Sequence, residues 1–152
     1  MNGPNATPPI VVGLDRTPAG SAALRWAARE ALRSGARVHA VQVYDRRNRA
    51  DLALVVDHDE ERTRERIRGH CQLLDVLGPR VADQCVVYSQ REGDLAEQLL
   101  EAGRDAAVVV VGAPSCSQTR TLVESLREHS DCPVVVVDEW GAAHPFSDES
   151  VA

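Results

Sequence analysis

Short apolar runs, most of them rich in valine, alternate along this chain with longer stretches of helical periodicity. The clearest run covers residues 107–111, and Gly112 ends it. A polar loop is expected at residues 115–119, followed by a helix over residues 120–130. Apolar runs of this length predict strands that are buried on both faces of a parallel sheet. The pattern predicts five strands, at residues 9–14, 37–44, 84–89, 107–111 and 133–137.

The segments between the predicted strands carry helical spacing. In residues 58–77, apolar residues recur every three or four positions, which predicts an amphipathic helix. Its apolar stripe is Ile67, Cys71, Leu74 and Leu77. Residues 45–57 have no clear period and are expected to form a long surface loop. The other predicted helices are residues 21–34, which Gly35 ends, and residues 95–104, for which Asp94 is the expected N-cap.

Strands that alternate with helices of ten or more residues predict an α/β fold. Right-handed crossovers make the sheet parallel and place helices on both of its faces. We therefore predict a single Rossmann-like domain over residues 9–138, with an open five-stranded parallel sheet. Residues 1–8 are expected to be a flexible leader, and residues 139–152 a flexible C-terminal tail.

Charge and composition exclude several classes of function. All 17 basic residues are arginine, so chemistry that depends on a lysine is absent. A net charge of −6 argues against binding to nucleic acids or anionic membranes. No window reaches the ~18 apolar residues of a membrane span. The start of the chain does not resemble a secretory signal, and the four cysteines are widely spaced, so we expect reduced thiols and a cytoplasmic location.

A ligand site is expected where the strand order of an open parallel sheet reverses, beyond the carboxyl ends of the strands. Asp15 follows the first predicted strand and Gly112 follows the fourth, so these two positions lead the candidates. Asp15 has a second interpretation of equal weight. Its carboxylate could serve only the backbone, by accepting hydrogen bonds from Thr17 or from the first helix.

Other reactive side chains give weaker patterns. Cys116 in the polar loop is a weak candidate for a redox thiol, because only Arg120 lies near it. His129 and Cys132 do not complete a zinc pattern, and His129 is better interpreted as a cation beside a helix C-terminus. The arginines at residues 62–68 alternate with glutamate, which favours a solvated, salt-bridged helix face. No catalytic constellation emerges, so the sequence favours binding over catalysis.

With these segments placed, residues 9–138 resemble the universal stress protein family. The resemblance is carried by Ile10-Val-Val-Gly-Leu-Asp15, by Glu92-Gly-Asp-Leu-Ala-Glu97 leading to Gly112, and by residues 124–137 with Cys132-Pro133. It implies the strand order 3-2-1-4-5. It also implies a homodimer through the last strand, here Val134, Val135, Val136 and Val137, which would lie at the sheet edge.

One branch of that family binds ATP through Gly-x2-Gly-x9-Gly-[Ser/Thr] after the fourth strand. Here the first glycine matches Gly112, the second falls on Ser115, and the last pair falls on Arg120-Thr121, with only four residues between. The resemblance also places Asp15 near the nucleotide and Val41 beside the adenine. Thr121 is expected to cap the helix. The sequence thus predicts a binding or regulatory domain with a degenerate ATP site, the alternative being an ATP-binding member that uses Asp15, Gly112 and Thr121.

Two other classes of protein share the alternation of strands and helices. A nucleotide α-hydrolase usually carries Ser-Gly-Gly-x-Asp-Ser after the first strand, where this chain has Asp15-Arg-Thr-Pro18. A phosphate-accepting receiver domain needs an acidic pair after the first strand, an aspartate after the third and a lysine after the fifth. The chain lacks these residues, so the receiver interpretation fails, and the hydrolase interpretation is the weaker alternative.

Overall fold

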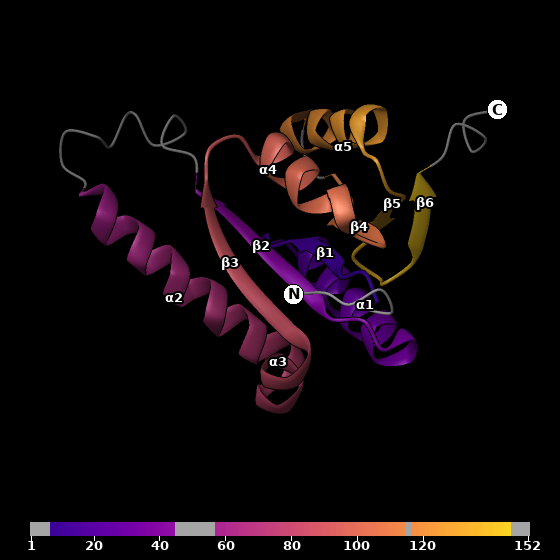
Figure 1. The fold of residues 1–152 in the computed structure, drawn as a ribbon. Helices are drawn as coiled ribbons and strands as arrows, with labels where there is room; N and C mark the ends of the chain where they lie inside the picture. The colour runs from indigo at the N-terminus through magenta and orange to yellow at the C-terminus, as the bar shows by residue number, and fades with distance from the viewer. Residues whose placement is uncertain (1–6, 45–56, 115–116, 147–152) are drawn as a thin grey trace.

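The computed structural model describes residues 7–44, 57–114 and 117–146, and these contain a six-stranded sheet (Figure 1). The strand order is β3-β2-β1-β4-β5-β6, so the predicted α/β fold and the order of its first five strands are confirmed. All pairings among those five strands are parallel. Of the predicted loop at residues 45–57, all but Asp57 lies outside the described residues. The strands are β1 (Ile10–Gly13), β2 (Val38–Tyr44), β3 (Val86–Glu92), β4 (Val108–Gly112), β5 (Val134–Val137) and β6 (Ala143–Phe146).

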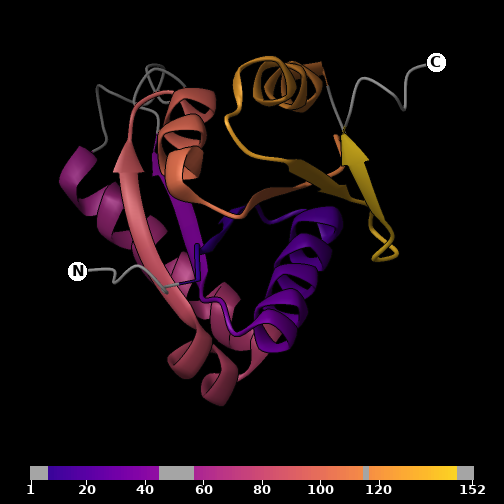
Figure 2. The same cartoon turned by 45° about the vertical axis from the view of Figure 1, so that its right-hand side comes forward.

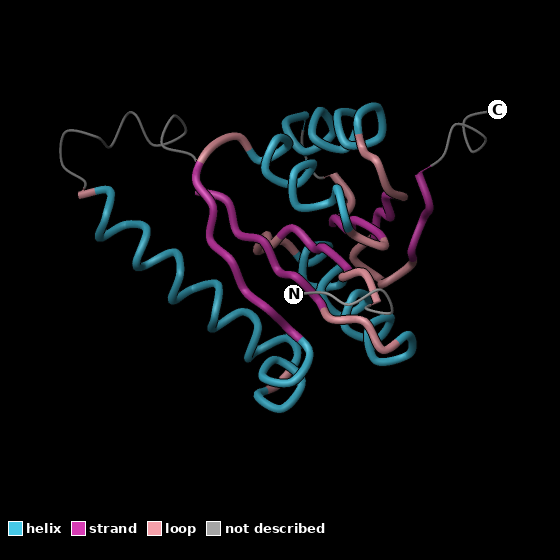
Figure 3. The backbone as a smooth tube through the Cα atoms, viewed as in Figure 1, coloured by secondary structure: helices cyan, strands magenta, loops and turns pink. Residues whose placement is uncertain are grey.

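Helices cover both faces of the sheet (Figures 2 and 3). One face packs against the first three helices, and the other packs against α4 and α5. The short helix α3 was not predicted, because Gly78-Pro79 is typical of a helix end. Proline is also favoured in the first turn of a helix, and Pro79 begins a new one. The helices are α1 (Pro18–Ser34), α2 (His58–Leu77), α3 (Pro79–Cys85), α4 (Leu95–Ala102), a 3-10 turn (Gly103–Asp105) and α5 (Ser117–His129).

The valine runs fill two separate cores. Successive residues of a strand point to opposite faces of the sheet, so neighbouring valines enter different cores. Val110 packs with the alanine-rich face of α1, whereas Val109 and Val111 pack with Leu99 of α4 and Leu126 of α5. Burial on both faces explains why these strands are continuous apolar runs and do not alternate with polar residues.

The predicted helix at residues 58–77 is present as α2, but most of its apolar stripe does not face the sheet. Its buried residues are Glu65, Gly69 and Leu73, whereas Ile67 is 58% exposed and Leu74 is 49% exposed. The face of α2 that turns toward the sheet is the one that can approach the sheet closely, at Gly69, and that finds polar partners there, at Glu65. A Cβ on Gly69 would lie 2.6 Å from Oε1 of Gln42 and 3.0 Å from Cε2 of Tyr88, so a larger residue would have to displace these side chains or move the helix away from the sheet.

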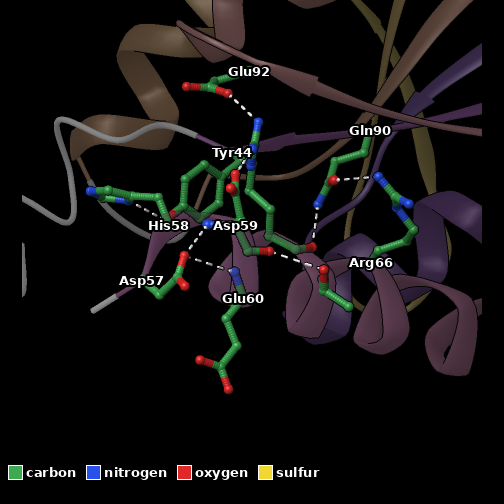
Figure 4. Close-up of polar contacts among 10 residues, drawn as sticks. Tyr44, Asp57, His58, Asp59, Glu60, Arg66, Gln90 and Glu92 are labelled. Atoms are coloured by element: carbon green, nitrogen blue, oxygen red, sulfur yellow. Dashed lines mark hydrogen bonds and ion pairs between the residues drawn. The ribbon is translucent and has the colours of Figure 1, made fainter. Parts of the chain in front are cut away.

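The N-terminal half of α2 is joined to the ends of β2 and β3 by polar contacts (Figure 4). Tyr44 Oη lies 2.9 Å from His58 Nδ1, and the Arg62 guanidinium donates to Glu92 at 2.8 Å. Gln90 Nε2 donates to the carbonyl of Arg62 at 2.8 Å. Arg64 forms ion pairs with Glu60 and Glu61 on its own helix. The predicted salt-bridged face is therefore confirmed, and part of it also fixes α2 to β3.

β6 pairs antiparallel with β5, so the prediction that Val134–Val137 lies at the sheet edge is wrong. Residues 143–146 of the predicted tail form this extra strand. The turn before it is organised by Asp138, whose carboxylate accepts from the N–H groups of Ala142 at 2.9 Å and Trp140 at 3.0 Å. The bond from Ala142 lowers the pKa of Asp138. Gly141 supplies the left-handed backbone that the turn requires, with φ 87°.

The outer edge of β6 carries a proline. Asp138 N–H donates to the Ala142 carbonyl at 3.0 Å, so these two residues form a hydrogen-bonded pair of the antiparallel ladder. Such pairs recur at every second residue along β5 and β6. Pro145, opposite Val135, therefore lies at a position that is not hydrogen-bonded to β5. The backbone nitrogen of residue 145 therefore points away from β5. Because proline has no N–H, the outward edge lacks a donor at this position, which disfavours the addition of another strand.

Within the described ranges, no helix combines the length and the apolar content needed to cross a bilayer.

Candidate functional site

The turn between β1 and α1 engages the side chain of Asp15. Its Oδ1 accepts from the backbone N–H of Thr17 at 2.7 Å and from the Thr17 hydroxyl at 2.5 Å. Thr17 is the N-cap of α1, and its Oγ1 accepts from the N–H of Gly20 at 3.0 Å. Of the two interpretations of Asp15, the bond to Thr17 is thus present in the structure. The carboxylate fixes a capping residue and is already part of a local hydrogen-bond network.

Gly112 lies at the end of β4, directly against the first turn of α1. A Cβ at this position would lie 2.7 Å from the nitrogen of Gly20 and 2.8 Å from the carbonyl carbon of Ala19. Gly20 is equally constrained, because its own Cβ would lie 2.4 Å from Oδ1 of Asp15. The structure therefore brings Asp15, Gly20 and Gly112 together at the strand switch point. Packing of α1 on β4 is enough to require glycine at residue 112.

The connection between β4 and α5 is shorter than predicted. α5 begins at Ser117, so residues 117–119 belong to the helix and not to a loop. Thr121 is consequently in the second turn of α5, and the prediction that it caps the helix is wrong. Polar residues are common in the first turn of a helix, and here they give it the composition of a loop. Arg120 and Thr121 are both exposed, whereas Ser115 and Cys116 lie outside the described residues.

Val41 is fully buried and belongs to the core that contains Leu99 and Val11. Its side chain therefore lines no surface at the end of β2. The predicted set thus separates into three groups. Asp15 and Gly112 adjoin the same turn of α1, Arg120 and Thr121 are exposed on α5, and Val41 is in the core.

A buried polar network behind the β1–α1 turn was missed by the sequence analysis. The Glu65 side chain is only 8% exposed, and its two oxygens accept from Arg16 at 2.7 Å and from Arg68 at 2.6 Å. Gln42 Nε2 lies 3.4 Å from Glu65, and the Tyr88 hydroxyl donates to Gln42. The available signal was a glutamate four residues before a glycine on α2, a spacing that places both on one helix face.

A second contact links α2 to the candidate site. Gln72 Nε2 donates to the backbone carbonyl of Asp15 at 2.6 Å. Arg16, the next residue, reaches Glu65. Two consecutive residues of the turn are therefore held by α2, one through its backbone and the other through its side chain. This network positions the turn without offering a reactive group.

His39 on β2 is the half-buried histidine of the sheet. Its Nε2 lies 2.8 Å from the Ser89 hydroxyl on β3. Burial lowers the pKa of His39, and the positive charge of Arg91 lowers it further. The neutral imidazole is therefore the form that the folded protein favours.

We expect this histidine to make folding stability fall in acid. A histidine in the unfolded chain has a pKa of about 6.5. Because the folded pKa is lower, the unfolded chain binds more protons below that pH, and the free energy of unfolding decreases there. Urea unfolding at pH 7.5 and 5.5 measures the decrease. His39→Gln, which does not titrate, should show a smaller decrease, and an equal decrease in both proteins would contradict the assignment.

Metal and thiol chemistry have little support in the described ranges. No group of three His, Cys, Asp or Glu side chains there is placed to hold a metal ion. Cys71, Cys85 and Cys132 are free thiols. His129 lies in the last turn of α5, as predicted, with Nδ1 at 3.1 Å from the Ser125 carbonyl.

Comparisons with known proteins agree on one family. The model of the Universal stress protein family matches residues 7–138. A universal stress protein family member from Burkholderia pseudomallei is 25% identical, with a TM-score of 0.61 over 89% of this chain and 98% of that chain. UspA from Lactobacillus plantarum is 17% identical, with a TM-score of 0.62 over 86% and 97%.

A third solved structure is described as a universal stress protein in complex with cAMP. It is 17% identical to this chain, with a TM-score of 0.61 over 89% of this chain and 99% of that one. At this identity the likeness is one of fold. Among curated proteins, no sequence matches the chain.

Proposed function

The chain belongs to the universal stress protein family, and we propose that it is a binding or regulatory domain whose adenine-nucleotide site is weak or lost. The observation that supports this most is the short connection between β4 and α5. Only residues 113–116 separate Gly112 from the first residue of α5. A phosphate cradle is built from successive backbone N–H groups in a glycine-rich loop, and four residues offer few of them.

The hydrogen bonds that the Asp15 carboxylate already accepts support the same proposal. Its Oδ1 already accepts two hydrogen bonds from Thr17, and a nucleotide hydroxyl would have to compete with them or use the other oxygen. The first turn of α1 also offers few N–H groups, because that of Gly20 donates to Thr17 and Pro18 has none. The groups nearest Gly112 therefore serve the protein itself.

The alternative is an adenine-nucleotide-binding member that uses Asp15, Gly112 and Thr121, with Arg120 replacing lost backbone amides through its guanidinium. The solved relative in complex with cAMP favours this alternative. Arg120 and Thr121 are exposed on α5, which begins just after the β4 end, so both are accessible to a ligand.

Equilibrium dialysis against ATP, ADP and cyclic nucleotides distinguishes these proposals. We expect dissociation constants of about 1 mM or weaker, which corresponds to about −4 kcal/mol of binding free energy. Micromolar ATP affinity would contradict the weak-site proposal. If such affinity were lost in both Arg120→Ala and Thr121→Ala, but kept in Arg127→Ala on the same helix, the alternative site would be correct.

We also propose that the protein acts by binding and not by catalysis. The side chains at the switch point serve capping and packing, as Asp15 and Thr17 illustrate. The nucleotide α-hydrolase alternative predicts turnover of ATP to AMP and pyrophosphate that depends on Asp15. Product formation that disappears in Asp15→Ala would overturn the proposal.

A cytoplasmic location and a homodimer remain proposals of the same kind. The free thiols of Cys71, Cys85 and Cys132 are consistent with a reducing compartment. Direct pairing of β5 with its copy requires β6 to leave, because β6 occupies that edge. A homodimer that keeps β6 in place needs a different face of the molecule.

A further inference from the structure

A serine and a histidine form a hydrogen-bonded pair on the sheet, away from the strand switch point. Nε2 of His39 on β2 lies 2.8 Å from the Ser89 hydroxyl on β3. Ser89 is in register with Val41, two residues after His39, so the two side chains meet diagonally across neighbouring strands. Neither residue belongs to the two apolar cores or to the turn that holds Asp15. The pair is therefore a polar feature for which neither core packing nor the candidate site accounts.

The pair lies on a part of the sheet that solvent reaches. Val86 and Tyr88 of β3 pack into the core on the side of α1, so the alternate residues Val87, Ser89 and Arg91 face the opposite side. α4, which packs on that opposite side, lies beside the carboxyl end of β3 (Figures 1 and 2). Val87 is 46% exposed, and Ser89 and Arg91 are only partly buried. A small molecule can therefore approach the Ser89 hydroxyl from solvent.

The imidazole of His39 has the position and the charge state of a general base. A serine hydroxyl is a weak nucleophile until an adjacent base takes its proton. The 2.8 Å between Nε2 and Oγ is within the reach that such a transfer needs. In the tautomer that carries its proton on Nδ1, Nε2 accepts the hydroxyl proton. Burial lowers the pKa of His39, so the imidazole is neutral at pH 7 and can take that proton.

The charged groups that flank the pair on its two strands are basic. Arg91 follows Ser89 by two residues on the same face of β3, and its charge acts on His39. Arg37 precedes His39 by two residues on the same face of β2. α4 packs on this side of the sheet through the apolar Leu99. When a hydroxyl attacks an acyl carbon, negative charge develops on the carbonyl oxygen, and a guanidinium beside it stabilises that charge.

We propose that Ser89 is an acylation site, to which an activated ester or thioester transfers its acyl group with His39 as the general base. The bond from Oγ to the carbonyl carbon forms as the bond from that carbon to the leaving oxygen or sulfur breaks. The hydroxyl proton passes to Nε2 and then to the leaving group, and nothing is oxidised or reduced. The chain gains one acyl group, with no lysine amine to compete for it. This modification goes beyond the proposed binding role and does not depend on a nucleotide.

Incubation of the full chain with para-nitrophenyl acetate, followed by intact mass measurement and peptide mapping, tests the site. We expect one acetyl group on Ser89 and release of one equivalent of nitrophenolate. Neutral hydroxylamine, which removes acetyl groups from thiols and imidazoles, should leave this serine ester in place. Ser89→Ala should lose the acetylation, and His39→Gln should slow it about a hundredfold, the lower end of the range for general-base catalysis. Circular dichroism checks that both variants fold.

The pH dependence of the acetylation rate separates a reacting pair from a structural hydrogen bond. Because the base must be unprotonated, the rate should rise with pH through the lowered pKa of His39 and level off near neutral pH. Arg91→Ala removes one cause of the lowered pKa, so the rise should shift toward higher pH. The same variant should slow the reaction about tenfold or more, because a group that stabilises the oxyanion is lost.

Ser125 and His129 on α5 are the matched control. His129 Nδ1 lies 3.1 Å from the backbone carbonyl of Ser125, a group that cannot be acylated. Ser125→Ala and His129→Gln should therefore leave the rate at Ser89 unchanged. A wild-type chain in which Ser89 stays unmodified overturns the proposal. So does an acetylation rate at Ser89 that is the same in His39→Gln, because the imidazole would then serve only the structure of the sheet.

Discussion

Gly112→Ala is expected to destabilise the domain by about 3 kcal/mol, the upper part of the range for overpacking a close contact. The added Cβ would lie 2.7 Å from the nitrogen of Gly20 and 2.8 Å from the carbonyl carbon of Ala19. Both are backbone atoms of α1, so no side chain can rotate away, and the helix must shift from the sheet. Urea unfolding followed by circular dichroism, with linear extrapolation, measures the loss.

Gly13→Ala is the matched control, at the end of the neighbouring strand β1. The atom nearest its Cβ would be Cδ1 of Leu99, at 3.2 Å, a side-chain contact that a shift of a few tenths of an ångström relieves. We expect a loss of about 1 kcal/mol or less. If Gly112→Ala were as mild as the control, helix packing would not be the reason for the glycine. A phosphate-binding role would then predict a stable variant with altered nucleotide affinity.

The close approach at Gly112 illustrates what the sequence can and cannot predict. Its position after a buried strand was predicted, because a run of valines ended by glycine indicates a strand end. The neighbour that requires the glycine is α1, which precedes it by about ninety residues along the chain. No local pattern encodes that contact. The edge of the sheet where a site should lie was predictable, whereas the partners of each residue there were not.

The buried face of α2 could not be predicted either, because it also depends on contacts with distant parts of the chain. Periodicity finds the face with the most apolar residues and assumes that it is buried. Here the buried face combines Leu73 with Gly69 and Glu65, and Glu65 meets Arg16 and Gln42 from elements outside the helix. β6 was missed because residues 143–146 include a proline, which argues against a central strand but is compatible with an edge strand.

Glu65→Ala should cost about 3 kcal/mol of folding stability, the lower end of the range for breaking a buried ion pair. The Glu65 side chain is 8% exposed, whereas Arg16 is 54% exposed and Arg68 is 49% exposed. When the carboxylate is removed, the guanidinium groups of Arg16 and Arg68 can still reach water, and this limits the loss of folding stability. Gln42 loses an acceptor in the interior. Urea unfolding at neutral pH measures the change.

A double-mutant cycle separates the ion pair from simple loss of volume. Arg16→Ala alone should cost about 1 kcal/mol or less, because its side chain is half exposed. In Glu65→Ala the same substitution should cost less still, and the difference, at most about 1 kcal/mol, is the coupling energy between the two residues. Glu65→Gln keeps the volume and should fall between wild type and Glu65→Ala. Additive effects of Arg16→Ala and Glu65→Ala would mean that α2 does not hold the β1–α1 turn through this contact.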